Sequence, residues 1–414
     1  MGQKIFSVRD FQSAAKRRLP RIVFDFLEGG ALDEITLREN RSDFDILHVV
    51  QRVLCDVRQV ELGTNLLGRP LAMPIVVSPM GGLALYHPEG DLAIARAAHK
   101  AGTVFIHSAW SSSPLEQVVA IAPHSTWVQV AFWQDKGFTA EHVARARAAG
   151  ADVLVVAGDV GVSSKRERDL RNGAGIPPSL GIRGLASMAT KPRWLARYAV
   201  GRKLTYGNYE IDGRPMQMAE MESFMHAQEN PGATWSDVEE LRNHWSGKII
   251  VKGIMAQDDV HIAKDVGVDA VMVSNHGGRQ FDAQLSTVAA LPRLVDEAGG
   301  AIDVIVDGGI RRGSDVVKCL ALGATACGIG RPAAYALATR GTDGPDQLFG
   351  ILAEELRVAL GFAGCTDVRR VDRSLLESER APAAAFNDWY ACNTHVSSRS
   401  SRNSVEESLP NRTA

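Results

Sequence analysis

The sequence predicts an α/β fold: a (β/α)8 barrel with an N-terminal helical cap and a long insertion after the fourth strand. Short apolar runs rich in β-branched residues recur along the chain, and each is followed by a segment with helical periodicity. The runs are continuously apolar, as in strands that helices bury, so a closed parallel barrel is favoured over an open doubly wound sheet. The predicted strands are 71–78, 103–108, 126–132, 153–157, 248–252, 270–274, 304–306 and 326–329.

The segment before the first predicted strand reads as a helical cap. Residues 10–52 are amphipathic, with apolar side chains such as Leu19, Val23 and Leu27 spaced to cover a surface. We therefore divide the chain into a cap at 1–65 and a barrel at 66–380.

The strand spacing breaks once, at 171–243, which we predict to be a mobile insertion over the mouth of the barrel. Within it, residues 187–204 mix basic and aromatic side chains at helical spacing. Such a stretch suits an anionic membrane surface. A solvated helix packed on the barrel or on a neighbouring subunit explains the same pattern, and we weigh it slightly higher.

Composition bounds the remaining possibilities. The chain has 414 residues and a net charge of -2, without the basic excess of a nucleic-acid binder. It shows no secretory signal and no apolar window long enough to span a membrane. The 5 cysteines are scattered without C-x-x-C spacing, which indicates neither disulfides nor a metal site and predicts a reducing, cytoplasmic location. The polar, Ser-rich tail at 393–414 is predicted to be disordered.

The last two predicted strands end in glycines beside arginines. Gly308 and Gly309 precede Arg311, and Gly330 precedes Arg331. Bare backbone N–H groups at a strand-to-helix turn, together with positive charge, form a phosphate cradle. A glycine pair alone often marks only a tight turn, but the loops after strands seven and eight of such barrels commonly hold a cofactor phosphate.

Other strand ends carry groups suited to acid–base chemistry. The sixth strand leads into His276 and Arg279, a candidate proton acceptor and a candidate carboxylate ligand. The fourth leads to Asp159, which could orient that imidazole, although an isolated aspartate is by default a loop cap. The fifth ends at Lys252, which needs an anionic partner if it is buried. Hydroxyl and amide groups able to bind a planar heterocycle lie at other strand ends: Ser108, Gln129 and Ser274.

Several of these runs together resemble one enzyme family. "LPRIVFDFLEGGALDE", "RERDLRN", "SNHGGRQFD", "DGGIRRGSDVVKCLALGA" and "IGRP" are similar to the FMN-dependent 2-hydroxy acid dehydrogenases and oxidases. That family includes glycolate oxidase, flavin-type lactate dehydrogenases and mandelate dehydrogenase, and the wording here is nearest to the last. The likeness extends over residues 6–365. It implies a barrel, often tetrameric, that binds FMN at its C-terminal mouth and oxidises a 2-hydroxy acid to the 2-oxo acid.

The resemblance also implies residue roles. His276 would be the base with Asp159 as its partner, Arg279 and Arg166 would bind the substrate carboxylate, and Lys252 would face the flavin N1/C2 edge. The remaining implied cofactor residues are Pro79, Met80, Gly81, Ser108, Gln129, Ser274, Asp307, Gly308, Gly309, Arg311, Gly330 and Arg331.

Two departures bear on the substrate. The family places one substrate-binding tyrosine in the cap and another two residues after the third-strand glutamine, and we assign these positions to Phe24 and Ala131. The missing phenols predict a bulky or aryl substrate resembling mandelate. The alternative is a non-standard natural-product or peptide-derived substrate. A non-catalytic FMN-binding protein is the third and least favoured hypothesis.

The electron acceptor is the other open point. In the family, glycine at the position of Gly81 accompanies dehydrogenases, which favours a quinone over oxygen. A quinone acceptor would agree with a peripheral contact at the inner face of the membrane through residues 187–204.

Overall fold

The chain folds into the closed parallel barrel that the strand pattern predicts. A computed structural model describes residues 4–173, 182–200, 205–211 and 214–378. The barrel strands close in the order β10-β11-β12-β13-β4-β5-β6-β7. They are β4 (Ile75–Val77), β5 (Phe105–His107), β6 (Thr126–Val130), β7 (Val153–Ala157), β10 (Lys248–Ile254), β11 (Ala270–Val273), β12 (Asp303–Asp307) and β13 (Ala326–Ile329).

The first predicted strand began too early. Leu71 belongs to a separate antiparallel hairpin of β2 (Thr64–Leu66) and β3 (Arg69–Leu71), and the barrel strand starts only at Ile75. Leu66 and Leu71 pack with Trp127 and other inward side chains of the barrel. The hairpin is apolar on one face because it closes the barrel interior.

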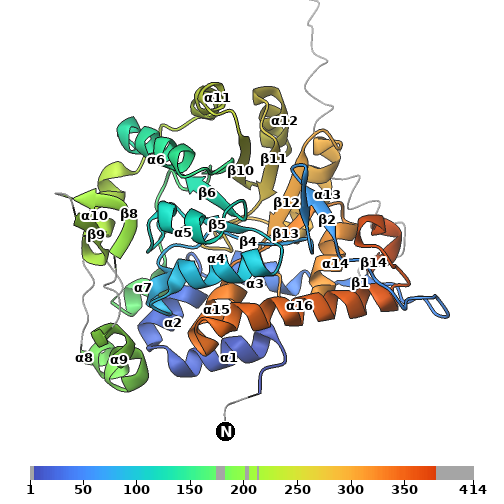
Figure 1. Cartoon of the computed structure of the whole chain (residues 1–414), viewed down its shortest axis with the longest axis horizontal. Coiled ribbons are helices and arrows are strands. Elements are labelled where there is room, and N and C mark those ends of the chain that lie inside the picture. The colour runs from blue at the N-terminus through green and yellow to red at the C-terminus, as the bar shows by residue number, and fades with distance from the viewer. Residues whose placement is uncertain (1–3, 174–181, 201–204, 212–213, 379–414) are drawn as a thin grey trace, which may run out of the picture.

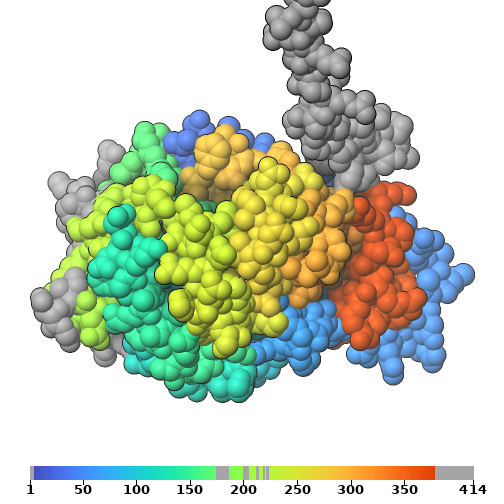
Figure 2. Space-filling view, turned by 90° about the horizontal axis from the view of Figure 1, so that it is seen from above, coloured from blue at the N-terminus to red at the C-terminus, as the bar shows by residue number. Residues whose placement is uncertain are grey.

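Helices cover the outside of the barrel, and α12 and α13 lie side by side there (Figure 2). Their inner faces are largely alanine, valine and leucine, which pack on the outward side chains of the strands. The outer helices are α4 (Gly90–Lys100), α5 (Leu115–Ile121), α6 (Lys136–Ala148), α11 (Trp235–His244), α12 (Gln257–Val266), α13 (Thr287–Ala298), α14 (Gly313–Ala321), α15 (Arg331–Arg340) and α16 (Asp343–Phe362).

The cap comprises α1 (Val8–Arg18), α2 (Arg21–Glu28) and α3 (Ile35–Ser42). Helix α1 packs along α15 below the barrel (Figure 1), and α2 contacts α7 (Glu167–Arg171) and α15. The strand β1 (Leu47–Val49) pairs with β14 (Leu376–Ser378), which joins the two ends of the described chain. Short 3-10 turns complete the structure at η1 (Leu83–Leu85), η2 (Val368–Arg370) and η3 (Arg373–Leu375).

The insertion contains α8 (Ile182–Ala189), α9 (Pro192–Val200), a hairpin of β8 (Thr205–Ile211) and β9 (Arg214–Gln217), and α10 (Met218–Gln228). Helix α11 packs beside α12 in the outer ring, so the insertion ends earlier than the predicted boundary at 243. Within the described ranges, no helix is long and apolar enough to cross a membrane. The predicted disordered tail and residues 201–204 lie outside the described residues.

Candidate active site

An imidazole and a carboxylate meet at the C-terminal mouth of the barrel. His276 follows β11 and Asp159 follows β7, and His276 Nδ1 lies 3.0 Å from Asp159 Oδ2 and 3.2 Å from Oδ1. The pairing holds the ring by one nitrogen and directs the other away from the carboxylate, which is the arrangement of a base with its orienting acid.

His276 has a left-handed backbone, with φ of 56°. This conformation is uncommon for a residue with a side chain and costs about 1–2 kcal/mol. Its amide nitrogen donates to Ser274 Oγ at 3.1 Å, and the two glycines that follow also have positive φ. Strain of this kind is concentrated at functional sites, where the surrounding structure fixes it.

Asp159 remains ionised in its buried position. Burial alone would raise its pKa, but the charges of His276 and Lys252 outweigh burial, and the pKa of this carboxyl lies below its ordinary value of 3.8. A carboxylate that stays charged at neutral pH stabilises the imidazolium that forms when His276 takes a proton.

Arg279 is fixed against the cap. Its Nη1 donates to the carbonyl oxygens of Phe26 and Gly29, both at 2.8 Å, and its guanidinium lies over the Phe26 ring at 5.0 Å. Burial, with the like charge of Arg166, lowers its pKa to about 10, so it remains a cation at neutral pH. Within the described residues, its Nε and Nη2 form no hydrogen bond, which leaves one edge of the fork for an anion.

The cap aromatic residue at the site is Phe26, which corrects the prediction for Phe24. Phe24 is buried in the main hydrophobic core with Val23 and Leu27. Residues 23, 24 and 27 share one face of α2, whereas residue 26 lies on another face, about 200° further round the helix than residue 24. The sequence pattern located the right helix but the wrong face.

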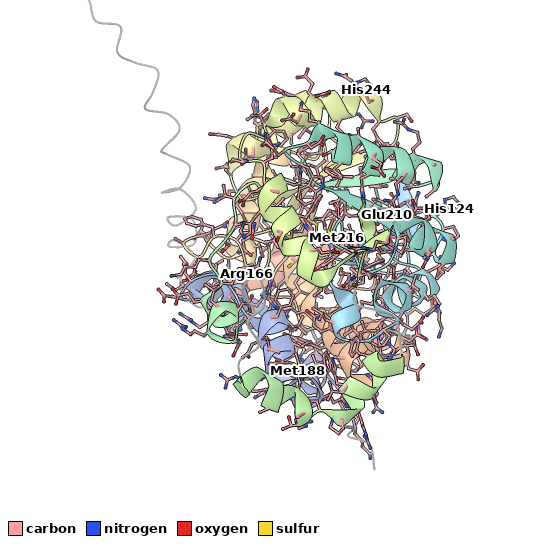
Figure 3. All side chains as sticks on the ribbon, turned by 90° about the vertical axis from the view of Figure 1, so that its left-hand side faces the viewer. His124, Arg166, Met188, Glu210, Met216 and His244 are labelled. Carbon is pink, nitrogen blue, oxygen red and sulfur yellow. The ribbon has the colours of Figure 1, made fainter. Side chains whose placement is uncertain are left out.

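Arg166 lies at the start of α7, on the loop that follows β7 (Figure 3). Its Nη1 is 4.0 Å from Asp169 Oδ2. Burial raises the pKa of Asp169, although Arg279 and Arg166 oppose the increase. The charges of both arginines therefore act on the same carboxylate, Asp169, as expected if the two guanidinium groups are close enough to bind one substrate carboxylate together.

Lys252 is 2% exposed and points into the barrel mouth. Its Nζ donates to Ser274 Oγ at 2.8 Å and lies 3.8 Å from Asp307 Oδ2. Ser78 donates to the same Asp307 oxygen at 2.9 Å. The buried lysine thus has the anionic partner that the sequence requires.

Ser108 and Gln129 are brought together at the next strand ends. Gln129 Oε1 accepts from Ser108 Oγ at 3.0 Å and from the Ala109 amide at 3.2 Å. Trp110 donates its amide to Ser108 Oγ, and its indole nitrogen is buried without a partner in the described structure. Trp110 was missed by sequence analysis, which had followed strand ends and not the loops beyond them.

The glycine pair after β12 has a structural reason that the sequence did not reveal. Gly308 and Gly309 both have positive φ, and a Cβ on Gly309 would overlap the backbone of Asn40 in the cap. The adjacent Arg311 donates its amide to Asp315 Oδ2 at 2.8 Å and Nη1 to the Ile310 carbonyl at 2.9 Å. The close approach of the cap explains Gly309, the contact with Thr287 explains Gly308, and the phosphate role of this turn stays a prediction.

Arg331 donates with all three guanidinium nitrogens, two of them to the cap and one to the loop after β11. Nε donates to Leu27 O, Nη1 to Gly277 O and Nη2 to Gly29 O, each at 2.9 Å. Burial lowers its pKa to about 10, which still leaves it charged at neutral pH. These contacts account for its buried charge, so the predicted phosphate contact would have to come from other groups of this turn.

The segment 79–81 lies beside the start of α15 and the loop after β5. A Cβ on Gly330 would sit 3.4 Å from Met80 Sδ, which is ordinary contact, whereas a Cβ on Gly81 would lie only 2.8 Å from Trp110 Cβ. Pro79 precedes Met80 at the end of β4 and is partly exposed. Gly81 is therefore the tightly confined position of this segment.

Ala131 packs against side chains of the insertion. It is buried with Trp133, Tyr209 and Met216, and the ring of Tyr206 packs on the same cluster. The insertion thus supplies aromatic side chains beside the position where the family places a tyrosine. No local signal in the sequence indicated this, because the contact joins segments about 75 residues apart.

The buried polar groups fit the flavin mononucleotide that the motifs imply. Asp307 Oδ1 is a buried acceptor with no hydrogen bond in the described part of the chain, and it lies where a sugar-alcohol hydroxyl could donate to it. Lys252 supplies a buried cation beside it, and Ser108 with Gln129 supplies polar groups for a heterocycle. A polyhydroxylated chain attached to a polar ring matches this set of groups.

Comparisons with known proteins agree with the site. The family described as FMN-dependent dehydrogenase matches residues 15–378. The chain is 39% identical over 382 residues to an L-lactate dehydrogenase of Caulobacter vibrioides, covering 92% of this chain and 99% of that one. It is 37% identical over 371 residues to an L-lactate oxidase of a Nostoc species, covering 89% and 96%.

A solved structure is similar over the same extent. The monotopic membrane protein (S)-mandelate dehydrogenase superposes with a TM-score of 0.87 at 34% identity, covering 91% of this chain and 100% of that one. The similarity spans cap, barrel and mouth. The chain therefore belongs to the FMN-dependent dehydrogenase family and is an FMN-dependent 2-hydroxy acid oxidoreductase.

Proposed function

We propose that this protein oxidises an aryl-substituted 2-hydroxy acid to the 2-oxo acid, with His276 as the base. The observation that carries the proposal is the contact of 3.0 Å between His276 Nδ1 and Asp159 Oδ2, beside the free edge of Arg279. A base, its orienter and a carboxylate ligand are what oxidation of a carbon next to a carboxylate requires.

The side chains at the mouth would bind the substrate and take its proton. Arg279, helped by Arg166, binds the substrate carboxylate and fixes the hydroxyl-bearing carbon near His276. His276 Nε2 takes a proton, and Asp159 stabilises the resulting imidazolium. FMN, when bound, would supply the acceptor for the two electrons and the second proton that leave the substrate.

Other side chains would hold the cofactor. Lys252 supplies positive charge at the flavin N1/C2 edge, and Asp307 accepts from the ribityl chain. The remaining proposed contacts are with Pro79, Met80, Gly81, Ser108, Gln129, Ser274, Gly308, Gly309, Arg311 and Gly330, with Arg331 through its backbone.

The aryl preference follows from the side chains on one wall of the mouth. Trp110, Trp133 and Tyr206 form an aromatic cluster around Ala131, and Phe26 lies under Arg279. A ring on the substrate would gain edge-to-face contacts there, worth about 0.5–1.5 kcal/mol beyond burial. A solved relative named for mandelate has the same overall fold.

The test is anaerobic reduction of the purified flavoprotein. Bleaching should be fast with mandelate and slower with lactate and glycolate, and His276→Asn should bleach about 10²- to 10⁴-fold more slowly with its flavin content unchanged. Full activity of that variant would exclude His276 as the base. Preference for glycolate would exclude the aryl assignment.

The electron acceptor is proposed to be a quinone. Gly81 is packed against Trp110, which limits space beside the segment 79–81. Readmitting air after reduction tests this: slow return of the oxidised flavin, and fast return on adding a soluble quinone, are expected. Rapid reoxidation by air alone would identify an oxidase.

Peripheral contact with the inner face of the membrane is proposed through α9. Trp194 and Tyr198 face inward, donating to the Leu85 and Ala84 carbonyls, whereas Arg193 is exposed. The contact would therefore be electrostatic, reinforced by basic side chains of α1. Sedimentation with anionic vesicles should fall sharply with added salt, and salt-independent binding would contradict this.

We also propose a homo-oligomer, which the family motifs imply to be a tetramer. Leu32, Ile35, Phe281 and Leu285 are exposed apolar side chains on the cap and the loop after β11, and Thr36 hydrogen-bonds to Asp282 between them. Light scattering of the full chain should give four times the chain mass. A monomer at micromolar concentration would contradict this.

A further inference from the structure

The mouth of this barrel lacks two hydroxyl donors where it would bind a carboxylate. Phe26 beside Arg279 and Ala131 after β6 carry no polar side-chain atom. A charged ligand in a buried site needs its oxygens satisfied, and the free edge of Arg279, with Arg166 and His276, still leaves acceptor positions on the carboxylate and on the hydroxyl oxygen without a donor. The remaining donors must come from O–H groups elsewhere on the walls of the mouth.

The insertion hairpin is fixed to this wall by buried hydrogen bonds. Asn208, 3% exposed, donates Nδ2 to the carbonyls of Ser108 and Ala109 at 3.1 and 3.2 Å and accepts from the Leu115 amide at 3.0 Å. Gly207 donates its amide to Ser111 O at 3.0 Å. The hairpin is thus attached to the loop that follows β5 and also carries Ser108.

The receiving loop is itself held firmly. Asp91, at the start of α4, accepts from Ser111 Oγ at 2.7 Å and from the Ser112 and Ser113 amides at 3.0 and 3.2 Å. A Cβ on Gly207 would overlap the backbone of Ser113, so the hairpin can come this close only with glycine there. These contacts make this part of the insertion a wall of the mouth, and the mobility of the insertion stays a prediction.

Tyr206 is carried by that wall to the Ala131 position. Its ring packs on the cluster of Ala131, Trp133, Tyr209 and Met216. Tyr206 pairs in register with Met216 across the hairpin, whose position relative to Arg166 can be followed in Figure 3. A phenol therefore reaches the space beside residue 131 from a different part of the chain.

A second buried phenol, Tyr86, ends the segment after β4, which is hydrogen-bonded to the loop after β5 through Gly82 N and Trp110 O. It follows η1, is 2% exposed, and its hydroxyl forms no hydrogen bond within the described residues. Burial raises its pKa, and the charges that act on it most strongly are those of Arg279 and Asp169, followed by Tyr206. It is therefore a protonated donor in the field of the arginine fork.

We propose that Tyr206 and Tyr86 are the substrate-binding phenols of this enzyme, replacing the hydroxyls absent at residues 131 and 26. The inference rests on the proposed 2-hydroxy acid chemistry and deepens it by assigning the donors that set specificity. Tyr206 donates to the substrate hydroxyl or its product carbonyl over Ala131, and Tyr86 donates to the carboxylate held by Arg279. The insertion is then part of the substrate site.

The experiment measures ligand binding without turnover. Benzoylformate, an aryl 2-oxo acid, is titrated into the oxidised flavoprotein, and its dissociation constant is read from the change in the flavin spectrum. Tyr86→Phe should raise that constant about 10- to 100-fold, since a bond to a charged group is lost, and Tyr206→Phe should raise it about 3- to 10-fold. Flavin content and melting temperature should stay at the wild-type values.

Tyr209→Phe is the matched control, because it lies in the same hairpin but its hydroxyl accepts from Trp133 Nε1 at 3.1 Å inside the cluster. It should change the dissociation constant less than twofold. The proposal is overturned if Tyr206→Phe and Tyr86→Phe bind like wild type, or if Tyr209→Phe loses as much affinity.

The two proposals fail differently. Tyrosine-dependent binding in a wild-type protein that no 2-hydroxy acid reduces would sustain the tyrosine assignment and refute the proposed reaction. Reduction of the flavin by mandelate, together with unchanged benzoylformate binding in both variants, would support the proposed reaction and refute the tyrosine assignment. If Tyr86→Phe loses flavin, Tyr206→Phe decides alone, because its ring is only partly buried.

Discussion

His276 Nδ1 lies 3.0 Å from Asp159 Oδ2, and the carboxylate of that pair keeps its charge in a buried site. Two strand ends separated by 117 residues along the chain thus form one proton-accepting unit. The charge of this pair leads to expectations for how activity and stability change with pH and when either residue is replaced.

Replacing Asp159 with Asn should lower the rate of flavin reduction by about 10²- to 10⁴-fold, because the imidazolium loses its counter-charge and its orienter. Anaerobic flavin reduction by mandelate measures this, and a wild-type rate would contradict it.

The same substitution should change how stability depends on pH. Since the folded pKa of Asp159 lies below 3.8, its ionised form contributes stability that is present above that pH and lost as the pH falls through the folded value. Urea unfolding of both proteins at pH 7 and near pH 3 tests this. A stability difference that grows on acidification would contradict it.

Gly81→Ala should strain the mouth. The added Cβ would lie 2.8 Å from Trp110 Cβ and 3.1 Å from its carbonyl oxygen, so backbone or indole must shift at a cost of about 1–3 kcal/mol. Thermal unfolding and flavin content measure the effect. Gly350→Ala is the control, because its Cβ would meet nothing within 4 Å inside α16 and should be neutral or stabilising.

Gly207→Ala should detach the hairpin from the loop after β5. Its Cβ cannot fit against the backbone of Ser113 and Pro114, so the buried contacts of Asn208 would be lost together. Limited proteolysis should cut the insertion faster than in the wild type, and affinity for benzoylformate should fall. Gly232→Ala, in the same insertion, meets only the side-chain oxygen of Asn230 at 3.3 Å and should leave both unchanged.

Substitutions of Arg331 and Arg311 should distinguish a loss of apoprotein stability from a loss of FMN affinity. Arg331→Met removes donors from two cap carbonyls and from the Gly277 carbonyl after β11, and should lower apoprotein stability by about 3 kcal/mol or more. Arg311→Met should weaken FMN binding with little change in apoprotein stability. Apoprotein melting and FMN titration of both variants test this, and a stable Arg331→Met apoprotein with poor FMN affinity would assign Arg331 to the phosphate.

The barrel was predictable from the sequence because its strands are buried by helices on one side and by one another inside. The runs therefore appear as largely apolar segments without alternation, and the strand ends pointed to the His276 and Asp159 pair. Leu71 was wrongly placed in the first barrel strand, because an apolar run has the same appearance in a barrel strand and in a hairpin that covers the end of the barrel. Phe24 was misassigned because adjacent aromatic residues in α2 require the helical face to be known.

Tyr206 could not be assigned from the sequence at all. Its place beside Ala131 depends on the Asn208 contacts, which connect segments about 100 residues apart. Likewise, the contacts of Arg331 with the end of α2 follow from the packing of the cap on α15 and leave no local signature. The sequence pattern gives the charged groups, and only the packing determines which acceptor each of them meets.

The contacts of Arg279 and Arg331 with the last turn of α2 make the cap and the barrel one electrostatic unit. Carbonyl oxygens at the end of a helix carry partial negative charge, and here they accept from two buried cations. A barrel produced without its first 30 residues would lose these acceptors and expose both guanidinium groups to water. The cap is therefore unsuited to exchange between relatives as an independent module, and chimaeras should be joined outside it.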